Sequence, residues 1–164
     1  MTHKQINTAA PAVQFVRARG FTLIELMITV VIAAILMSIA FPLYLHQIRE
    51  SRRTDARSAL LDLASREERY YAINNVYTQT ASDVGYTGWG SGNPIGSGYY
   101  YLVQPVVTAA SGTSPAGFTL VAKPVSGKGQ DKDSDCQTFT VTQTGQETST
   151  NSANADSSSI CWGQ

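Results

Sequence analysis

The chain has 164 residues, which is enough for one ordinary domain and a further segment and excludes a large multidomain enzyme. It carries 12 Lys and Arg residues against 12 Asp and Glu residues, so its bulk charge gives no reason to expect a polyanionic partner. The charges are unevenly placed, because residues 1–20 hold three bases and no acid, whereas the rest of the chain holds nine bases and twelve acids. A basic leader therefore precedes a mildly acidic body.

The first predicted element is an apolar helix that follows the basic segment. Residues 21–45 are apolar almost throughout, and a run of about 20 such residues is long enough to span a bilayer. Their only charged side chain is Glu25, and an ionisable residue in a spanning helix is a functional hypothesis by default. Glu25 either reaches the membrane interface or meets a cation on a neighbouring subunit. Cleavage after Gly20 would create such a cation, the new α-amine of Phe21.

The charges beside the apolar run set its expected orientation. Basic residues lie on both sides of the run, and we follow the N-terminal group, which places that end in the cytoplasm and the following domain in the periplasm. The small residue at the sharp boundary, Gly20, lies before the apolar run, whereas a secretory signal is cut after its apolar core. Cleavage at Gly20 would therefore keep the helix in the product.

The start of the apolar run resembles the processing site of type IV prepilins, in the string Arg19-Gly20-Phe21-Thr22-Leu23-Ile24-Glu25-Leu26-Met27. The resemblance implies that a prepilin peptidase cuts after Gly20 and N-methylates Phe21. It also implies that Glu25, with the three residues before it, serves subunit assembly by pairing with the N-terminus of a neighbour. The implied partners are this peptidase and N-methyltransferase, other pilins in a helical filament, and the inner-membrane assembly machinery.

The helix is expected to continue beyond the apolar run as an amphipathic half over residues 49–73. One predicted face recurs at three- and four-residue spacing and would pack on a core: Ala56, Ala59, Leu60, Leu63, Glu67 and Tyr70. Pro42 removes a backbone hydrogen bond, and we predict a kink there rather than a helix end, because the apolar stripe continues beyond it. Asn74 and Asn75 are expected to stop the helix.

The remainder of the chain predicts an antiparallel sheet. After a loop rich in Gly, Ser, Thr and Asn come three strand-like runs at 99–107, 118–125 and 138–143. Packed on the amphipathic half of the helix, these runs predict an α+β domain with three to four strands, which is the pilin fold that the resemblance implies. The expected organisation is a leader at 1–20, an apolar helix at 21–48, its amphipathic half at 49–73, an αβ-loop at 74–98, and a sheet with a disulfide-bounded C-terminal region at 99–164.

Two cysteines, Cys136 and Cys161, are expected to form a disulfide, because the predicted orientation places them in an oxidising compartment. Their spacing is not C-x-x-C, which disfavours a redox pair. Half of residues 142–159 are Ser or Thr, so the disulfide would hold a loop that would otherwise tend to disorder. The pilin resemblance also implies such a disulfide-bounded region, and the ending Cys161-Trp162 is similar to that of the PilE-like minor pilins.

The globular part has few of the residue types that an enzyme or a nucleic-acid-binding protein needs. His3 lies in the leader and His46 at the membrane border, so the globular part has no histidine for general-base or metal chemistry, and no cofactor is expected. Residues 74–164 hold three lysines against six acids, which predicts only weak release of counterions from DNA.

One acidic pattern resembles the beginning of a calcium loop, at Asp131, Asp133 and Asp135. Cys136 occupies the position where such a loop needs Gly, and Thr142 stands in place of the final Glu. We therefore predict a solvated acidic turn without a metal ion. The cysteine pair favours a pilin over a secretion pseudopilin, since by resemblance such pseudopilins often bind calcium and commonly lack this disulfide.

The sequence thus predicts a structural subunit of a type IV pilus, by resemblance a minor pilin. It would reside as a single-pass protein in the inner membrane and then in the extracellular fibre, where it supports pilus biogenesis, twitching motility, adhesion or DNA uptake. Two alternatives remain open. One is a type II secretion pseudopilin, and the other is a signal-anchored periplasmic binding module that never assembles and keeps its leader.

Overall fold

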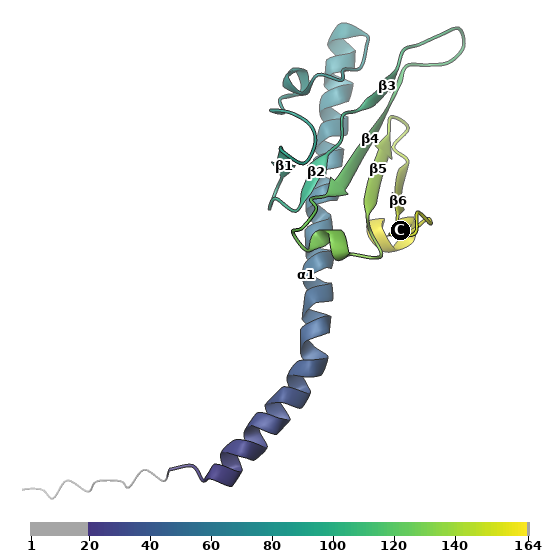
Figure 1. Cartoon of the computed structure of the whole chain (residues 1–164). Coiled ribbons are helices and arrows are strands. Elements are labelled where there is room, and N and C mark those ends of the chain that lie inside the picture. Colours follow the sequence, from purple (N-terminus) through teal and green to yellow (C-terminus); the bar gives the residue numbers. More distant parts are fainter. Residues whose placement is uncertain (1–19, 164) are drawn as a thin grey trace, which may run out of the picture. The chain divides into compact units, whose positions relative to one another are not determined.

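The computed structural model describes residues 20–163, so the predicted leader up to residue 19 lies outside the described residues. The chain divides into two compact units, Met1–Phe41 and Pro42–Gln164, and each is described by itself. The helix α1 (Leu23–Asn74) begins in the first unit and continues in the second. Figure 1 shows the order of the elements along the chain.

The described part of the first unit is an exposed apolar helix. An 18-residue window of α1 has a mean hydropathy of 2.6, and none of it is buried by the rest of the chain. Met37, for example, is 72% exposed. By length and composition, this helix can cross a membrane.

In the second unit α1 runs on from Pro42 and ends where the sequence predicted. Its last helical residue is Asn74, and Asn75 adopts a left-handed conformation with φ 58°. The Asn75 N–H donates to the carbonyl of Tyr71 at 2.8 Å, which satisfies one of the free carbonyls of the last turn. The predicted continuation through Pro42 and the predicted stop are both confirmed, with the end one residue later than expected.

The sheet has six antiparallel strands, β1 (Pro94–Ile95), β2 (Tyr100–Leu102), β3 (Val106–Thr108), β4 (Gly117–Pro124), β5 (Thr138–Thr142) and β6 (Glu147–Thr150). Their order is β1-β2-β4-β5-β6, and β3 also pairs with β4. Two short 3-10 helices lie in the connections, η1 (Ala81–Val84) and η2 (Gln130–Lys132). The α+β class is confirmed.

The strand count differs from the three to four that were predicted. The run 99–107 splits into β2 and β3, which pair with different parts of β4, and Pro105 lies between them. Pro has no backbone N–H and cannot continue a ladder, which accounts for the split. The edge strands β1 and β6 were not predicted, because one has two residues and the other is polar throughout.

The core lies between the sheet and the amphipathic half of α1. Leu60 and Leu63 of the helix are fully buried, as are Tyr100 of β2 and Phe139 of β5. The rings of Tyr100 and Phe139 meet edge to face, with their centroids 5.7 Å apart. Aromatic pairs prefer this arrangement, and it fixes the sheet on the helix.

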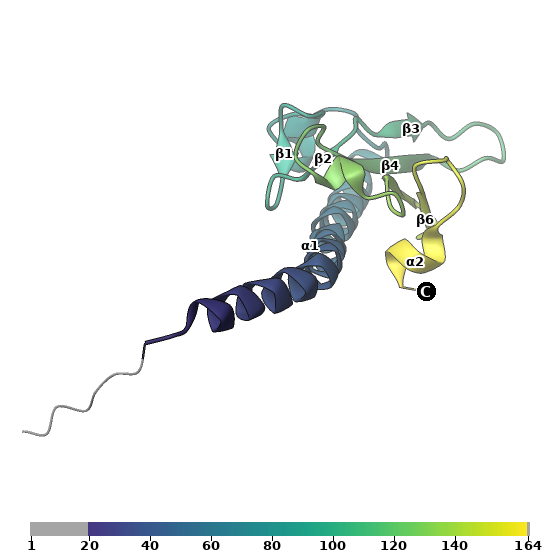
Figure 2. The same ribbon diagram turned by 60° about the horizontal axis from the view of Figure 1, so that its bottom comes forward.

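The C-terminal segment covers the free edge of β6. The indole Nε1 of Trp162 donates to the carbonyl of Thr148 at 2.9 Å, and the Ser157 N–H donates to the carbonyl of Ser149 at 3.0 Å. The short helix α2 (Ser158–Trp162) therefore lies beside β6, as Figures 1 and 2 both show. An edge covered in this way cannot pair with the strand of another chain.

Candidate functional site

The first candidate site is the beginning of α1, where the helix starts at a capped residue. The carbonyl of Thr22 accepts the first helical hydrogen bond, from the Leu26 N–H at 3.1 Å. The Thr22 hydroxyl accepts a second one, from the Glu25 N–H at 3.3 Å. Thr22 is therefore the N-cap, and Thr22 with Glu25 matches the capping-box pattern of Thr followed three residues later by Glu. The bond between Gly20 and Phe21 lies outside the helix.

Glu25 lies on the surface of this first turn. It lines an open hollow together with Gly20, Phe21 and Thr22. Within the described residues 20–163 no Lys, Arg or His forms an ion pair with Glu25. The flanking apolar side chains are exposed too, with Leu23 78% and Ile24 63% exposed. This arrangement suits a carboxylate that pairs with another subunit.

The predicted disulfide between Cys136 and Cys161 is present, with the two Cα atoms 5.8 Å apart. Both residues are buried, and Cys161 belongs to α2. The bond therefore holds the segment that covers β6, and the predicted disulfide-bounded region is confirmed. The short helix inside this region was not predicted.

The three aspartates of the acidic turn all have structural partners, and Asp133 and Asp135 share Arg53. The carboxylate of Asp133 accepts two hydrogen bonds from the Arg53 guanidinium, each at 2.8 Å. Asp131 accepts hydrogen bonds at 2.9 Å from the backbone N–H groups of Gly127 and Gly129, which lower the pKa of its carboxyl. Because Asp133 is engaged by Arg53, its oxygens are not free for a cation. That contact supports the prediction that this turn binds no calcium.

Sequence reasoning missed the buried ionic contacts of α1. Arg53 is 3% exposed, and Glu67, although placed on the packed face of the helix, was not given a partner. The backbone N–H of Thr78 donates to Glu67 Oε2 at 3.1 Å, which ties the αβ-loop to the helix. The spacing Arg53, Ala56, Leu60 would have revealed the buried arginine, because it extends the apolar face by one turn.

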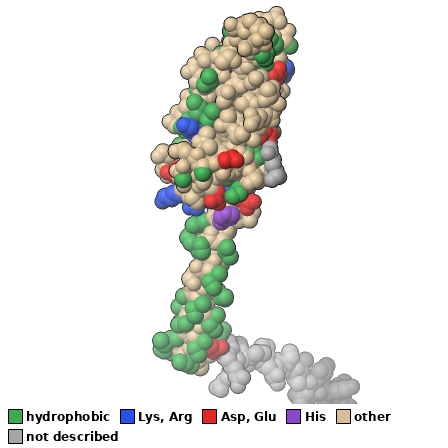
Figure 3. Space-filling model, turned by 90° about the vertical axis from the view of Figure 1, so that its right-hand side faces the viewer, with side chains coloured by type: hydrophobic (Ala, Val, Ile, Leu, Met, Phe, Trp, Pro, Cys, Tyr) green, Lys and Arg blue, Asp and Glu red, His purple; other side chains and the backbone are tan. Residues whose placement is uncertain are grey.

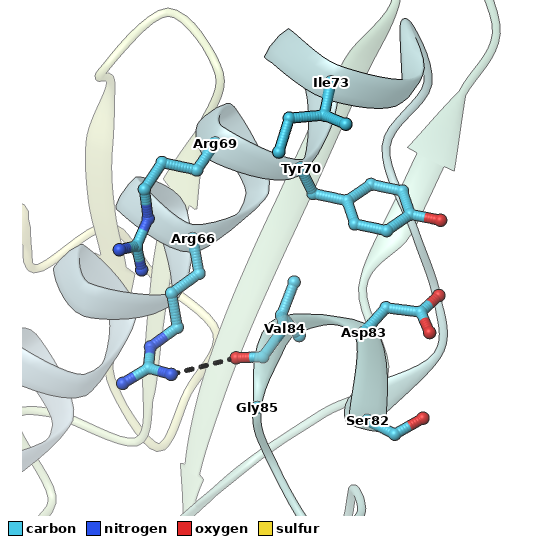
Figure 4. A pocket seen from close by; sticks show the side chains of 8 residues that line it. All are labelled: Arg66, Arg69, Tyr70, Ile73, Ser82, Asp83, Val84 and Gly85. Carbon is cyan, nitrogen blue, oxygen red and sulfur yellow. Dashed lines mark hydrogen bonds between the residues drawn. The ribbon is translucent and has the colours of Figure 1, made fainter.

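A hollow of about 440 Å³ lies between the last turns of α1 and η1, and Figure 4 shows the side chains that line it. The guanidinium of Arg66 closes one side by donating to the carbonyl of Val84 at 3.1 Å, and Arg69 lies beside it. The lining contains neither histidine nor cysteine, and its ionisable side chains are those of Arg66, Arg69, Tyr70 and Asp83.

A second hollow, of about 420 Å³, lies on the outer side of the sheet beside the disulfide-bounded region. Tyr101 of β2 and Lys123 of β4 line it together with Asn151 and Asn154. An aromatic ring, a cation and two amides are groups that can contact bases and phosphates. Asp131 lines the same hollow and opposes an anionic ligand there.

Two family profiles match the chain at adjacent positions. Residues 16–41 match the profile described as "Prokaryotic N-terminal methylation motif". Residues 42–140, more than half of the chain, match the profile described as "Type IV minor pilin ComP, DNA uptake sequence receptor". The first match contains the predicted processing string, and the second contains the amphipathic half of α1 and most of the sheet.

A curated relative is the "Type IV major pilin protein PilA" of Myxococcus xanthus (strain DK1622), 36% identical over 70 residues. The match covers 43% of this chain and 32% of the relative, so the chain spans about a third of the length of that relative. The long apolar helix, the antiparallel sheet and the C-terminal disulfide agree with these matches. The chain belongs to the type IV minor pilin ComP family.

Proposed function

We propose that this chain is a minor subunit of a type IV pilus, processed between Gly20 and Phe21 and then assembled through Glu25. The observation that carries the proposal is the Glu25 carboxylate, which has no ion-pair partner among residues 20–163 and lies in the first turn of an exposed, membrane-length helix, within the prepilin-like string. The methylation-motif match supports processing by a prepilin peptidase with other pilins as partners. The chain is a structural protein in this proposal, and no reaction is assigned to it.

The assembly step follows from the cost of an unpaired charge in an apolar medium. In the membrane, residues 21–45 lie among lipid tails, and in the fibre they would lie among the helices of neighbouring subunits. Glu25 loses water in both places, so an amine from the neighbour's Phe21 lowers the free energy of one register over others. The proposed location is the inner membrane with the N-terminus cytoplasmic and the domain periplasmic, and the extracellular fibre after assembly. The predicted kink at Pro42 remains part of this proposal.

Mass spectrometry of the chain from its native membrane tests the processing step. We expect a mature chain that begins at N-methylated Phe21 and has lost two hydrogens to the Cys136–Cys161 bond. A retained leader would contradict the proposal and favour the signal-anchored periplasmic module. The alternative of a secretion pseudopilin is tested by the presence of the chain in sheared pili, where a pseudopilin would be absent.

Glu25→Gln tests the assembly step, because it removes the charge and keeps the shape. We expect the variant to be inserted and processed but to be depleted in sheared fibres by about tenfold or more, since the proposed ion pair is lost in an apolar core. Glu50→Gln is the matched control, since Glu50 is exposed and lies beyond the apolar run. Equal incorporation of both variants would contradict the assembly role of Glu25.

We propose contact with DNA as a second function, because the matching family is described as a DNA uptake sequence receptor. The hollow beside Tyr101, Lys123 and the disulfide-bounded region is the surface that supports it. The excess of acids in the globular part opposes strong electrostatic binding, so recognition would depend on the ring and amides more than on charge. Fluorescence anisotropy with a short DNA duplex tests this. We expect Lys123→Glu to weaken binding and Arg69→Glu, which makes the same charge change elsewhere, to leave it unchanged.

A further inference from the structure

We infer that a basic collar beside the end of the apolar run binds the anionic phospholipid headgroups of the membrane before the subunit is assembled. The collar consists of Arg49 and Arg52 of α1 and Lys128 and Lys132 around η2. This inference rests on the proposed membrane-anchored state, and it adds a contact surface that assembly has to release.

The helix places the first two cations at the depth of the headgroups. The apolar run ends at Leu45, so at 1.5 Å per residue Arg49 follows about 6 Å later and Arg52 about 10 Å later. Tyr44, at the end of the run, is 63% exposed, and aromatic side chains at this position prefer the membrane interface. Arg49 and Arg52 lie three positions apart on one side of the helix. Glu50, the acid between them, lies about 160° around the helix axis from Arg52.

The loop around η2 brings two further cations to the same level of the helix. Gln130 Nε2 donates to the carbonyl of Arg49 at 3.3 Å, which fixes η2 against this turn of α1. Lys132 is the last residue of η2, and a Cβ on Gly98 would lie 3.6 Å from the Lys128 ammonium. Arg52 stacks over the ring of Tyr99, 3.5 Å from its centroid. Lys128 therefore lies near the turn between β1 and β2, which also contains Tyr99, the residue on which Arg52 stacks.

These four basic side chains are available to bind an anion outside the chain. In the part of the chain that the structure describes, none of them forms an ion pair. The nearby acids are already engaged, since Asp133 accepts from Arg53, and Asp135 lies within 4 Å of both Arg53 and His46. Asp131 is turned into the backbone N–H groups of its own loop. Figure 3 shows basic side chains at one end of the globular part, with acidic side chains and a histidine beside them.

A phosphodiester is the chemistry that this collar fits, and both lipids and DNA supply it. The position favours the lipid, because the collar begins about 6 to 10 Å beyond the end of the spanning run, a distance close to the Debye length of about 8 Å at physiological salt. Cations at that distance from an anionic bilayer are each attracted to it, and the attraction adds over the group. DNA is therefore an outcome of the test rather than the proposal.

The test uses the full chain, labelled with ¹⁵N, in lipid nanodiscs that contain a gadolinium-chelating headgroup. Paramagnetic relaxation of backbone amides reports which residues approach the headgroups. In discs with anionic phosphatidylglycerol, we expect strong relaxation at the amides of residues 127–132. We expect it to fall by about tenfold in neutral phosphatidylcholine discs and in about 1 M salt, where the Debye length is only about 3 Å.

Charge-reversal variants distinguish binding by the collar residues from an effect of the chain's overall charge. The double variant Lys128→Glu with Lys132→Glu should lose the anionic-disc relaxation, whereas Arg69→Glu should not change it, because Arg69 lies about 30 Å along α1 from Arg49. Equal relaxation in neutral and anionic discs, or no loss in the double variant, would overturn the proposal. If the double variant instead loses affinity for a short DNA duplex and keeps its relaxation, the collar binds DNA and not lipid. Leader cleavage and pilus incorporation are measured separately, so failure here leaves the proposed function standing.

Discussion

Arg53 and Asp133 form a buried ion pair that joins α1 to the turn before the disulfide. Nε and Nη2 of Arg53 donate to the two carboxylate oxygens, each at 2.8 Å, and both side chains are 3% exposed. Gln130 Nε2 adds hydrogen bonds at 3.1 Å to Asp133 and at 2.9 Å to the Tyr100 hydroxyl oxygen. The hydrogen bonds that Arg53 donates to Asp133 raise the pKa of the Arg53 guanidinium. Residues 80 positions apart in sequence are thereby held in one network.

Removing one partner of this pair should be costly, because the other charge stays buried. We expect Arg53→Met to lower the free energy of unfolding by about 3–5 kcal/mol. Urea unfolding of the full chain in detergent micelles, followed by near-UV circular dichroism, measures the loss. The control Arg57→Met removes a half-buried arginine that donates a hydrogen bond to the Thr54 hydroxyl and forms no ion pair with a described residue. It should change stability by about 0.5 kcal/mol or less, and an equal loss in both variants would contradict a stabilising pair.

The disulfide should protect the covered edge of β6 more than the rest of the sheet. Replacing Cys136 and Cys161 with Ser should cost about 3–4 kcal/mol in the chain-entropy description of such a loop. Hydrogen exchange locates the effect. In the double variant we expect the exchange rate of the Ser157 N–H, which donates to the Ser149 carbonyl, to rise more above its wild-type value than that of the Val103 N–H. The Val103 N–H donates to the Val121 carbonyl on the far part of the sheet. Equal acceleration at both amides would indicate global unfolding and contradict a local role.

The sequence predicted the elements whose signal is local. The apolar run, the stop at Asn74 and Asn75, and the strands with β-branched and aromatic residues were found because each pattern repeats over several residues. The ion pair between Arg53 and Asp133 was not predicted, because the sequence around either residue does not indicate a partner 80 positions away. The edge strand β6 was missed because its four residues are all polar and show no apolar alternation, although they pair with β5.

The buried carboxyl of Glu67 should make stability depend on pH. Glu67 is fully buried, and its Oε1 has no hydrogen-bond partner among the described atoms. Burial raises the pKa of Glu67 above its ordinary 4.5, and the charges of Asp83 and Glu68 raise it further, against the Thr78 hydrogen bond that lowers it. Because the folded state holds the proton more tightly than the unfolded chain, this contribution is fully present below about pH 4.5 and is lost as the pH rises through the raised pKa.

Glu67→Gln removes this titration and keeps an oxygen for the Thr78 N–H. We expect the variant to match the wild type at acid pH and to be more stable at neutral pH, where the wild type holds a buried charge. Urea unfolding across the pH range measures both curves. Glu68→Gln is the control, since Glu68 is exposed and accepts a hydrogen bond from the Tyr77 hydroxyl. If the pH slope of Glu67→Gln equals that of the wild type, Glu67 does not titrate in the expected window.

The cap at Thr22 should decide where α1 begins and how firmly its first turn holds Glu25. Thr22→Val keeps the shape of the side chain but removes the oxygen that accepts the Glu25 N–H, so the first turn should lose about 1 kcal/mol. Hydrogen exchange of the Glu25 amide in micelles should accelerate by about fivefold as a result. Thr22→Ser retains the acceptor and should keep the wild-type rate. The Thr29 hydroxyl instead donates to the Leu26 carbonyl inside the helix, so Thr29→Val should leave the Glu25 amide unaffected. Unchanged exchange in Thr22→Val would contradict a role for the Thr22 hydroxyl as the N-cap of α1.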